Sequence, residues 1–241
     1  MAALMCRINS APKARALDTR QPRSYPYLPE PERSPVAMNG SQHSCFLDRP
    51  SERYRDSFLA GASEFIGEGR LDSTYAALLG YDLRRLERRF SSFVWDLLQL
   101  GEKRPASSSG YLDRVFWLID GEEYVGQLSV RPELGTPYLV TYGGHVGYSI
   151  RPGLRRRGYG QIILSLALRE CIDMGLARLL VTCDSDNIAS KKIIERNGGR
   201  FESAMNMDGR GLEAEGRGRR ERVRKLRYWI DLDPVAEGVV R

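Results

Sequence analysis

Residues 155–161 combine three arginines and two glycines between an apolar strand-like stretch and an apolar helical stretch, and they read Arg-Arg-Arg-Gly-Tyr-Gly-Gln. The first N–H groups of a helix have no partners inside the helix, and its dipole adds partial positive charge there. Glycine lets backbone approach a ligand closely, because no Cβ stands in the way. The pattern predicts a phosphate-binding loop, although a tight turn with a solvated basic face would have the same local sequence.

Two common nucleotide motifs are missing from the chain. There is no GxxxxGK[ST] segment, which excludes a Walker loop, and no GxGxxG segment followed by an acidic residue about 20 positions later, which disfavours a dinucleotide-binding fold. A different kind of phosphorylated ligand is therefore expected at this loop.

The elements that would position the loop follow from hydrophobic periodicity. Helices are expected over residues 51–67 and 82–100, from about Gly160 to Gly175, and over 187–196, with Gly101 as a C-cap. Strands are expected over 115–119, 123–131, 138–142, 145–150, 178–183, 200–206 and 223–232, with Asp120-Gly121 as a hairpin turn. This order predicts a mixed α/β sheet with helices on its faces.

Composition divides the 241 residues into three parts. Residues 1–50 hold seven of the twelve prolines and little periodicity, so they are predicted to be a disordered extension rich in Pro, Ser and Arg. Residues 51–234 are predicted to form the domain, and residues 235–241 a tail. The four cysteines lack CxxC spacing and only two histidines are present, which argues against zinc or any other metal site and favours thiols in a reducing cytoplasm.

One local segment accounts for the formal net charge of +6. Residues 216–227 contain seven Lys or Arg and one Glu, and seven minus one is six, so the rest of the chain is balanced. The segment could be a solvated loop, could help hold phosphates or an acidic substrate, or could touch RNA. The last is least favoured, because no aromatic residue interleaves before Tyr228, and nucleic acid is not expected as a partner. No apolar run approaches the roughly 20 residues of a membrane span, so no membrane association is expected.

Two segments resemble the GNAT superfamily of N-acyltransferases. Residues 145–160 (HVGYSIRPGLRRRGYG) look like its fourth strand and acyl-CoA loop, in which Arg155, Gly158 and Gly160 match the pattern [QR]-x-x-G-x-[GA]. Residues 186–201 (DNIASKKIIERNGGRF) look like the Asn-led helix after its fifth strand. The resemblance is nearest to an uncharacterised bacterial branch, through Gly143-Gly144-His145, Thr182-Cys183 and the RYWI of residues 227–230.

The resemblance implies a fold, a reaction and a co-substrate. The fold would be α/β, with a mixed, mostly antiparallel central sheet and helices on both faces. The reaction would be direct attack of a primary amine, on a small molecule or peptide, on the thioester of acetyl-CoA, without a metal. A homodimer stays open. The expected acyl-CoA contacts are Tyr148, Ser149, Ile150, Arg155, Arg156, Arg157, Gly158, Tyr159, Gly160, Gln161, Asn187 and Ser190.

The catalytic residues depart from the superfamily's pattern. Some members carry a base glutamate and many carry an acid tyrosine, and by resemblance these positions are Gly144 and Ile194, which cannot move a proton. We expect the Tyr148 backbone N–H to meet the oxyanion. His145 is the nearest candidate base, although a histidine hydrogen-bonded at a strand start is an equal alternative. Weaker proton-transfer candidates are Glu122, Glu123, Tyr142 and Tyr228, and Cys183 is disfavoured as a nucleophile. The two empty positions leave a non-catalytic acyl-CoA-binding regulatory module as the competing function.

Overall fold

The computed structural model describes residues 36–37, 44–102, 112–206 and 223–232. In these residues eight strands form one sheet in the order β1-β2-β3-β4-β5-β6-β8-β7. The strands are β1 (Val36–Ala37), β2 (Ser44–Asp48), β3 (Arg114–Asp120), β4 (Glu123–Val130), β5 (Val146–Ile150), β6 (Arg178–Asp184), β7 (Arg200–Asn206) and β8 (Arg224–Asp231). Every neighbouring pair is antiparallel except β5 and β6, which run parallel. The predicted mixed, mostly antiparallel α/β sheet is confirmed.

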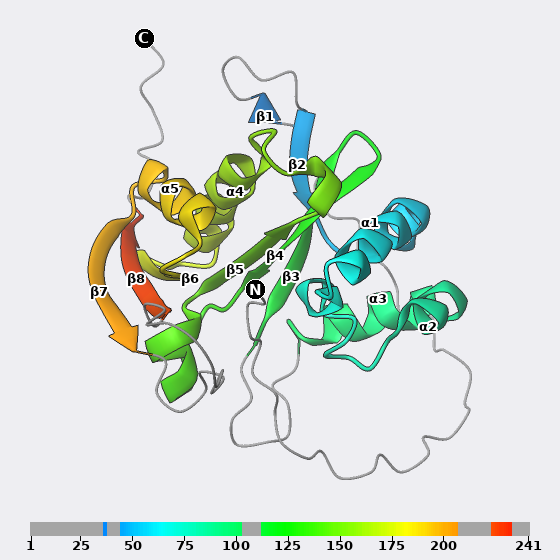
Figure 1. Cartoon of the computed structure of the whole chain (residues 1–241), viewed down its shortest axis with the longest axis horizontal. Helices are drawn as coiled ribbons and strands as arrows, with labels where there is room; N and C mark the ends of the chain where they lie inside the picture. Colours follow the sequence, from blue (N-terminus) through cyan, green and yellow to red (C-terminus); the bar gives the residue numbers. More distant parts are fainter. Residues whose placement is uncertain (1–35, 38–43, 103–111, 207–222, 233–241) are drawn as a thin grey trace, which may run out of the picture.

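Helices cover both faces of this sheet (Figure 1). One face carries α4 (Tyr159–Asp173) and α5 (Ile188–Arg196), and the other carries α1 (Arg55–Gly67), α2 (Leu83–Arg88) and α3 (Phe90–Gln99). Short turns complete the fold: η1 (Glu52–Tyr54), η2 (Leu71–Thr74), η3 (Leu139–Gly143) and η4 (Pro152–Leu154).

Each face has its own hydrophobic core. On the α4 side, Ile163, Leu164 and Ala167 are fully buried against the strands, as the helical spacing predicts. On the α1 side the core is aromatic, and the Phe58 ring stacks on Trp117 with centroids 4.8 Å apart. The sheet is therefore held between two separate apolar layers, which fix its position relative to the helices.

Four sequence predictions need correction, the first three of which concern where elements begin and end. The helix expected over residues 82–100 is interrupted at Arg89, and the Arg55 side chain donates to the carbonyl of Glu87 there, at 2.8 Å. The helix then ends at Gln99, so Gly101 is not its cap. β2 lies inside the stretch assigned to the extension, and all but its first residue pairs with β3, so the sheet includes residues before position 51. The predicted tail and most of residues 1–50 lie outside the described residues.

The strand expected over residues 138–142 is wrong, because η3 is a π-helical turn. The β-branched and aromatic residues of this stretch favour a strand. Hydrogen bonds override that preference: Leu139 N–H donates to the Thr136 hydroxyl at 3.1 Å, and Gly144 N–H returns to the Leu139 carbonyl at 2.7 Å. Gly144 has φ 73°, a left-handed conformation that ends the turn and that glycine adopts at low cost.

Candidate active site

A gap opens between β5 and β6 at the centre of the sheet. β5 pairs with β4 over all five of its residues, but it shares one registered pair with β6, Val146 with Val181. Beyond that pair the two parallel strands separate. The edge of β5 from Gly147 to Ile150 is therefore unpaired on its β6 side, and it can accept an extended ligand as an added strand.

Alternation along β5 decides which backbone groups face this gap. Arg151 N–H donates to the Val125 carbonyl of β4 at 2.9 Å. Successive amides of a strand point to opposite edges, so those of Ser149 and Gly147 also face β4 and those of Tyr148 and Ile150 face the gap. The Ile150 carbonyl already accepts a bond from Arg155 Nε at 3.1 Å. Tyr148 N–H thus faces the open edge, whereas the backbone N–H of Ser149 does not, and the contact of Tyr148 N–H with an oxyanion stays a prediction.

The loop that follows β5 turns into α4 with the geometry of an anion site. Gly158 is the N-cap of α4 and has φ 91°, and a Cβ there would meet nothing within 4 Å. Gly160 serves a different purpose, because a Cβ there would lie 2.5 Å from Ile193 Cδ1 of α5. The first glycine therefore shapes the loop in open space, while the second lets two helices approach.

Two predicted ligand side chains are engaged elsewhere. The Arg155 guanidinium binds both carboxylate oxygens of Glu68, at 2.7 and 2.9 Å, which fastens the loop to the end of α1. The Tyr159 side chain is buried, and its hydroxyl donates to Asp120 at 2.8 Å. Arg156 and Arg157 are exposed beside Gly158. In this structure the loop thus offers its backbone and the second and third arginines, rather than the first arginine or the tyrosine.

Two buried polar atoms beside the gap have no hydrogen-bond partner among the described residues. They are the Tyr148 hydroxyl and Gln161 Oε1. Burial raises the pKa of Tyr148 to about 12, although the neighbouring Ser190 side chain opposes the shift. Buried polar groups are nearly always satisfied in folded proteins, so these two fit a ligand rich in amides and hydroxyls. Gln161 would accept a hydrogen bond, and Tyr148 could donate one.

The Asn187–Ser190 turn lies at the start of α5. Asn187 Oδ1 accepts a hydrogen bond from Ser190 N–H at 3.0 Å, so Asn187 is a helix N-cap. Ser190 is half-buried and Asn187 is exposed. Their contact with the co-substrate stays a prediction.

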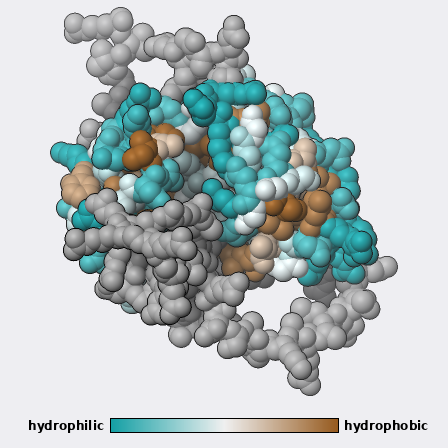
Figure 2. All heavy atoms as spheres, viewed as in Figure 1, coloured by the Kyte–Doolittle hydropathy of each residue, from teal (hydrophilic) through white to brown (hydrophobic). Residues whose placement is uncertain are grey.

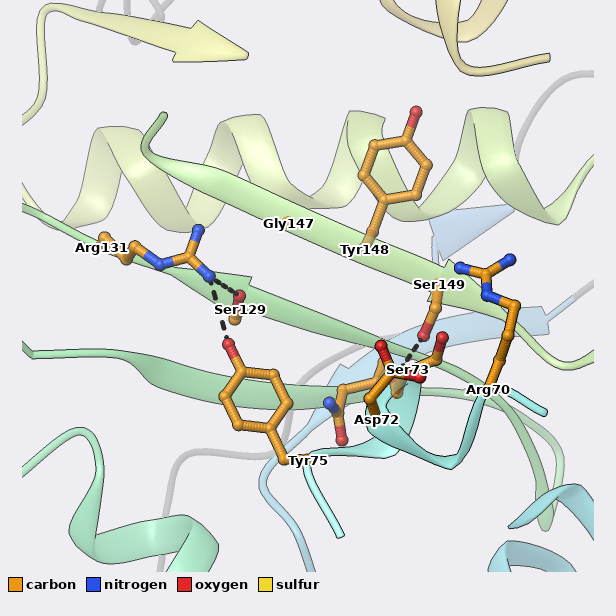
Figure 3. A pocket seen from close by; sticks show the side chains of 10 residues that line it. Arg70, Asp72, Ser73, Tyr75, Ser129, Arg131, Gly147, Tyr148 and Ser149 are labelled. Carbon is orange, nitrogen blue, oxygen red and sulfur yellow. Dashed lines mark hydrogen bonds between the residues drawn. The ribbon is translucent and has the colours of Figure 1, made fainter. Parts of the chain in front are cut away.

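A cavity of about 160 Å³ lies on the opposite side of β5 from the Tyr148 ring (Figure 3). It is roofed by η2, whose Ser73 carbonyl accepts a hydrogen bond from the Ser149 hydroxyl at 2.9 Å. Its walls come from η2, β4 and β5 and include several polar and charged residues: Arg70, Asp72, Ser73, Tyr75, Gln127, Ser129, Arg131, Gly147, Tyr148 and Ser149. Of these, the sequence pointed to Tyr148 and Ser149 alone.

The inner end of the cavity is held by a buried polar network. Asp113 Oδ2 accepts from the Tyr75 hydroxyl, and Arg131 Nη2 lies 3.4 Å from the same oxygen, 3.2 Å from the Tyr75 hydroxyl and 3.0 Å from the Ser129 hydroxyl. Arg131 and Asp113 are 6% and 4% exposed, so each charge offsets the other out of contact with water. Tyr75 reaches this network from a left-handed backbone conformation with φ 63°, which is uncommon for a residue other than glycine.

Comparison with known proteins identifies the domain. The model of the acetyltransferase (GNAT) domain family matches residues 81–200. The chain carries a GNAT acetyltransferase domain. The predicted reaction class and acetyl-CoA as co-substrate are those of this family, whereas the narrower bacterial branch stays a prediction.

Solved GNAT structures share the fold. Mycobacterium smegmatis RimJ in complex with CoA-disulfide is 20% identical, with a TM-score of 0.53, over 81% of this chain and 86% of that one. The acetyltransferase MccE of microcin C7 self-immunity, in complex with acetyl-CoA and AMP, is 12% identical, with a TM-score of 0.51, over 79% and 93%. A Salmonella typhimurium acetyltransferase that modifies the N-terminal serine of ribosomal protein L7/L12 is 17% identical, with a TM-score of 0.50, over 80% and 97%. No curated protein sequence matches the chain.

Gly144, where the sequence resemblance places the base glutamate of some members, has no room for a side chain. A Cβ on Gly144 would lie 2.6 Å from the Leu180 carbonyl oxygen, and the backbone there is left-handed, so a glutamate does not fit without a shift. Ile194, at the family's acid tyrosine, is fully buried in the α4-side core. The packing around Gly144 and around Ile194 therefore fits the residues that this chain carries at these two positions.

His145 is held by backbone on two sides. Its Nδ1 accepts a hydrogen bond from Leu180 N–H at 2.9 Å, and its backbone N–H donates to the Leu180 carbonyl at 2.8 Å. A neutral imidazole with an accepting Nδ1 carries its proton on Nε2, so it has no other nitrogen with which to take a proton. Burial also lowers the pKa of His145. This geometry does not support a catalytic base and indicates a residue that joins β5 to β6.

The weaker candidates also lie in other contacts. Glu122 and Glu123 pair with Arg53 and Arg151. The Tyr142 hydroxyl donates to the Asn206 carbonyl at 3.2 Å, while Tyr228 is 1% exposed in the α4-side core. Burial raises the pKa of Cys183 to about 11, which opposes the thiolate that a nucleophile needs.

The described residues contain no cluster of His, Cys, Asp and Glu suited to a metal ion. Among them there is also no helix with the length and apolar character to cross a membrane. The described surface seen in Figure 2 is largely hydrophilic, with separate apolar patches. Of the basic run, residues 217–222 lie outside the described residues, whereas Arg227 and Lys225 pair with Glu202 and Asp184 within the fold.

Proposed function

We propose that this domain transfers an acetyl group from acetyl-CoA to a primary amine by direct attack, with the two substrates on opposite sides of β5. The observation that carries this proposal is the strand itself. Its open edge presents Tyr148 N–H to the gap between β5 and β6, and one of its faces forms a wall of the cavity lined by Arg70 and Asp72. Acetyl-CoA would lie in the gap and the amine in the cavity.

The co-substrate would be held mainly by backbone. Its pantetheine arm would pair with the edge of β5, within reach of the unpartnered Gln161 Oε1. Its phosphates would meet the amides around Gly158, with Arg156 and Arg157 nearby and Asn187 and Ser190 across the gap. Tyr148 N–H would stabilise the oxyanion that forms at the thioester carbon. The buried Tyr148 hydroxyl, which keeps its proton at neutral pH, would protonate the departing thiolate.

The amine must lose a proton before it attacks. For a lysine-like amine with pKa near 10.4, neutralisation at pH 7 costs about 4.6 kcal/mol. Asp72 lines the cavity, and among the described residues its carboxylate has no hydrogen-bond or ion-pair partner. We assign to Asp72 the role that the family gives to glutamate, namely to take the amine's proton directly or through a water molecule.

Turnover with a panel of amines tests this proposal. Free thiol released from acetyl-CoA would be measured for the natural chain and for Asp72→Asn, with Asp56→Asn as the matched control, because Asp56 is an exposed carboxylate on α1. Asp72→Asn is expected to lower kcat/KM by about 10²- to 10⁴-fold and to leave acetyl-CoA binding unchanged. Asp56→Asn is expected to behave like the natural chain.

A regulatory acyl-CoA-binding module is the second candidate, and the residues at the family's base and acid positions, Gly144 and Ile194, favour it. That function would be indicated by saturable acetyl-CoA binding with no turnover of any amine. Equal turnover by Asp72→Asn and the natural chain would retain the enzyme but remove Asp72 from its mechanism. The homodimer stays a prediction.

A further inference from the structure

We infer that the acceptor is a small zwitterionic amine, of the kind of a free amino acid, whose anionic group is bound by Arg70 while its amino group lies at Asp72. This inference rests on the proposed function and adds the class of its acceptor. It comes from the charges that remain in the cavity when the internal pairs have been set aside.

The first step is the balance of charge. The cavity is lined by two arginines and one aspartate. Arg131 pairs with the buried carboxylate of Asp113, so its charge is offset inside the protein. That leaves one cation, Arg70, and one anion, Asp72. A ligand that carries one charge of each sign matches this pair.

The second step is the state of the Arg70 guanidinium. Among the described residues no carboxylate or carbonyl binds it, and its Nε is buried without a hydrogen-bond partner. A buried N–H of a charged group without a partner is costly, and guanidinium groups suit carboxylates through paired hydrogen bonds. Glu68, the nearest acid before it in sequence, is already bound by Arg155. An anionic group of the ligand would supply the missing acceptor.

The third step is the position of the two side chains. Arg70 is the N-cap of η2 and Asp72 lies in its first turn, so both are placed by the same short element. Figure 3 shows Asp72 beside the hydrogen bond between Ser73 and Ser149, while the Arg70 side chain extends from η2 to the end of β5. That bond and the Tyr75 network hold η2 over β5. In the proposed mechanism Tyr148 N–H of this strand polarises the thioester.

The size of the cavity restricts the acceptor further. Its volume of about 160 Å³ is well below the roughly 300–1,000 Å³ of sites for drug-sized ligands. Gly147 forms part of the wall, where a Cβ would lie 3.3 Å from the Ser129 hydroxyl and 3.5 Å from Arg131 Nη2. A diamine would place a second cation near Arg70, the cation left without an internal pair, which disfavours it electrostatically.

The test compares three acceptors of graded charge: L-alanine, L-alaninamide and 1,4-diaminobutane. For the natural chain, kcat/KM is expected to be roughly 10- to 100-fold higher for L-alanine than for its amide, because the amide lacks the group that Arg70 binds. Arg70→Met is expected to abolish that preference by raising the KM for L-alanine, with the KM for acetyl-CoA unchanged. Arg84→Met, a change of an exposed arginine on α2, is the matched control and is expected to keep the preference.

Each outcome has a distinct meaning. Equal turnover of the amide or the diamine would overturn the inference and leave the acetyltransferase in place. A rise in the KM for acetyl-CoA in Arg70→Met would overturn it too, since Arg70 would then bind the co-substrate. An absence of turnover with every amine, while acetyl-CoA still binds, would instead refute the proposed function.

Discussion

The two glycines of the loop before α4 should respond differently to the same substitution, because the structure gives them different physical roles. Gly158 has φ 91° and open space within 4 Å of where a Cβ would stand, whereas Gly160 is helical with Ile193 Cδ1 at 2.5 Å from that position. Gly158→Ala should therefore cost about 1–2 kcal/mol of backbone strain, whatever stands nearby. It should also weaken acetyl-CoA binding, since the amides of the loop would be redirected.

For Gly160→Ala two terms compete. Alanine is favoured over glycine in a helix by about 0.5–1 kcal/mol, whereas overpacking by a methyl group costs typically about 1–3 kcal/mol. The clashing atom is the end of a side chain that can turn about χ2, so the cost should lie near the lower limit. The net loss of stability should then be below about 1 kcal/mol.

Ile193→Val removes the one atom that the new Cβ would strike and leaves Cγ1 at 3.5 Å, an ordinary contact. In that background Gly160→Ala should become stabilising by about 0.5–1 kcal/mol. Gly158→Ala should cost the same with isoleucine or valine at position 193, because the two sites share no contact. Urea unfolding of the single and double variants of each pair, with acetyl-CoA binding by calorimetry, would measure both cycles. The reasoning would be refuted if Ile193→Val changed the stability effects of Gly158→Ala and Gly160→Ala equally, or if it left the effect of Gly160→Ala unchanged.

Two further substitutions test the groups beside the site. Burial lowers the pKa of His145 below its unfolded value near 6.5, so protonation favours unfolding, and stability should fall as pH drops below about 6.5. His145→Gln keeps an acceptor for Leu180 N–H but does not titrate, so its Tm should decline less between about pH 7 and 5; parallel Tm curves would argue against this. Tyr75→Phe removes the hydroxyl between Asp113 and Arg131 and should lower the free energy of unfolding by about 1–3 kcal/mol. A change below about 0.5 kcal/mol in urea unfolding would show that the network does not depend on that hydroxyl.

The elements around the predicted co-substrate loop could be predicted from the sequence because they depend on local pattern. The strand before the loop and the helix led by Asn187 are each encoded within a few residues, and the structure has both. The strand at residues 138–142 failed for the opposite reason. Its β-propensity was outweighed by the hydroxyl of Thr136 and the conformation of Gly144, which a propensity pattern does not weigh.

The proposed acceptor side could not be predicted because it is assembled from distant parts of the chain. Tyr75, Asp113 and Arg131 meet through a fold that joins three segments, and no spacing between them is regular. Arg70 and Asp72 stand in a polar turn whose composition resembles that of any surface loop. Only the fold shows that Arg70 and Asp72 line a cavity with β5 on its other side.

Strand alternation links the two halves of the site. The odd positions of β5, Gly147 and Ser149, face the cavity, while the Tyr148 side chain points to the α4 side and its amide points along the sheet. A one-residue shift in register would exchange these directions and place tyrosine in the cavity. Register is fixed by the pairing of β5 with β4, by the two hydrogen bonds between His145 and Leu180, and by the bond from Ser149 to Ser73. His145 thus helps to fix the register of β5, and in the proposed mechanism it orients this strand without itself transferring a proton.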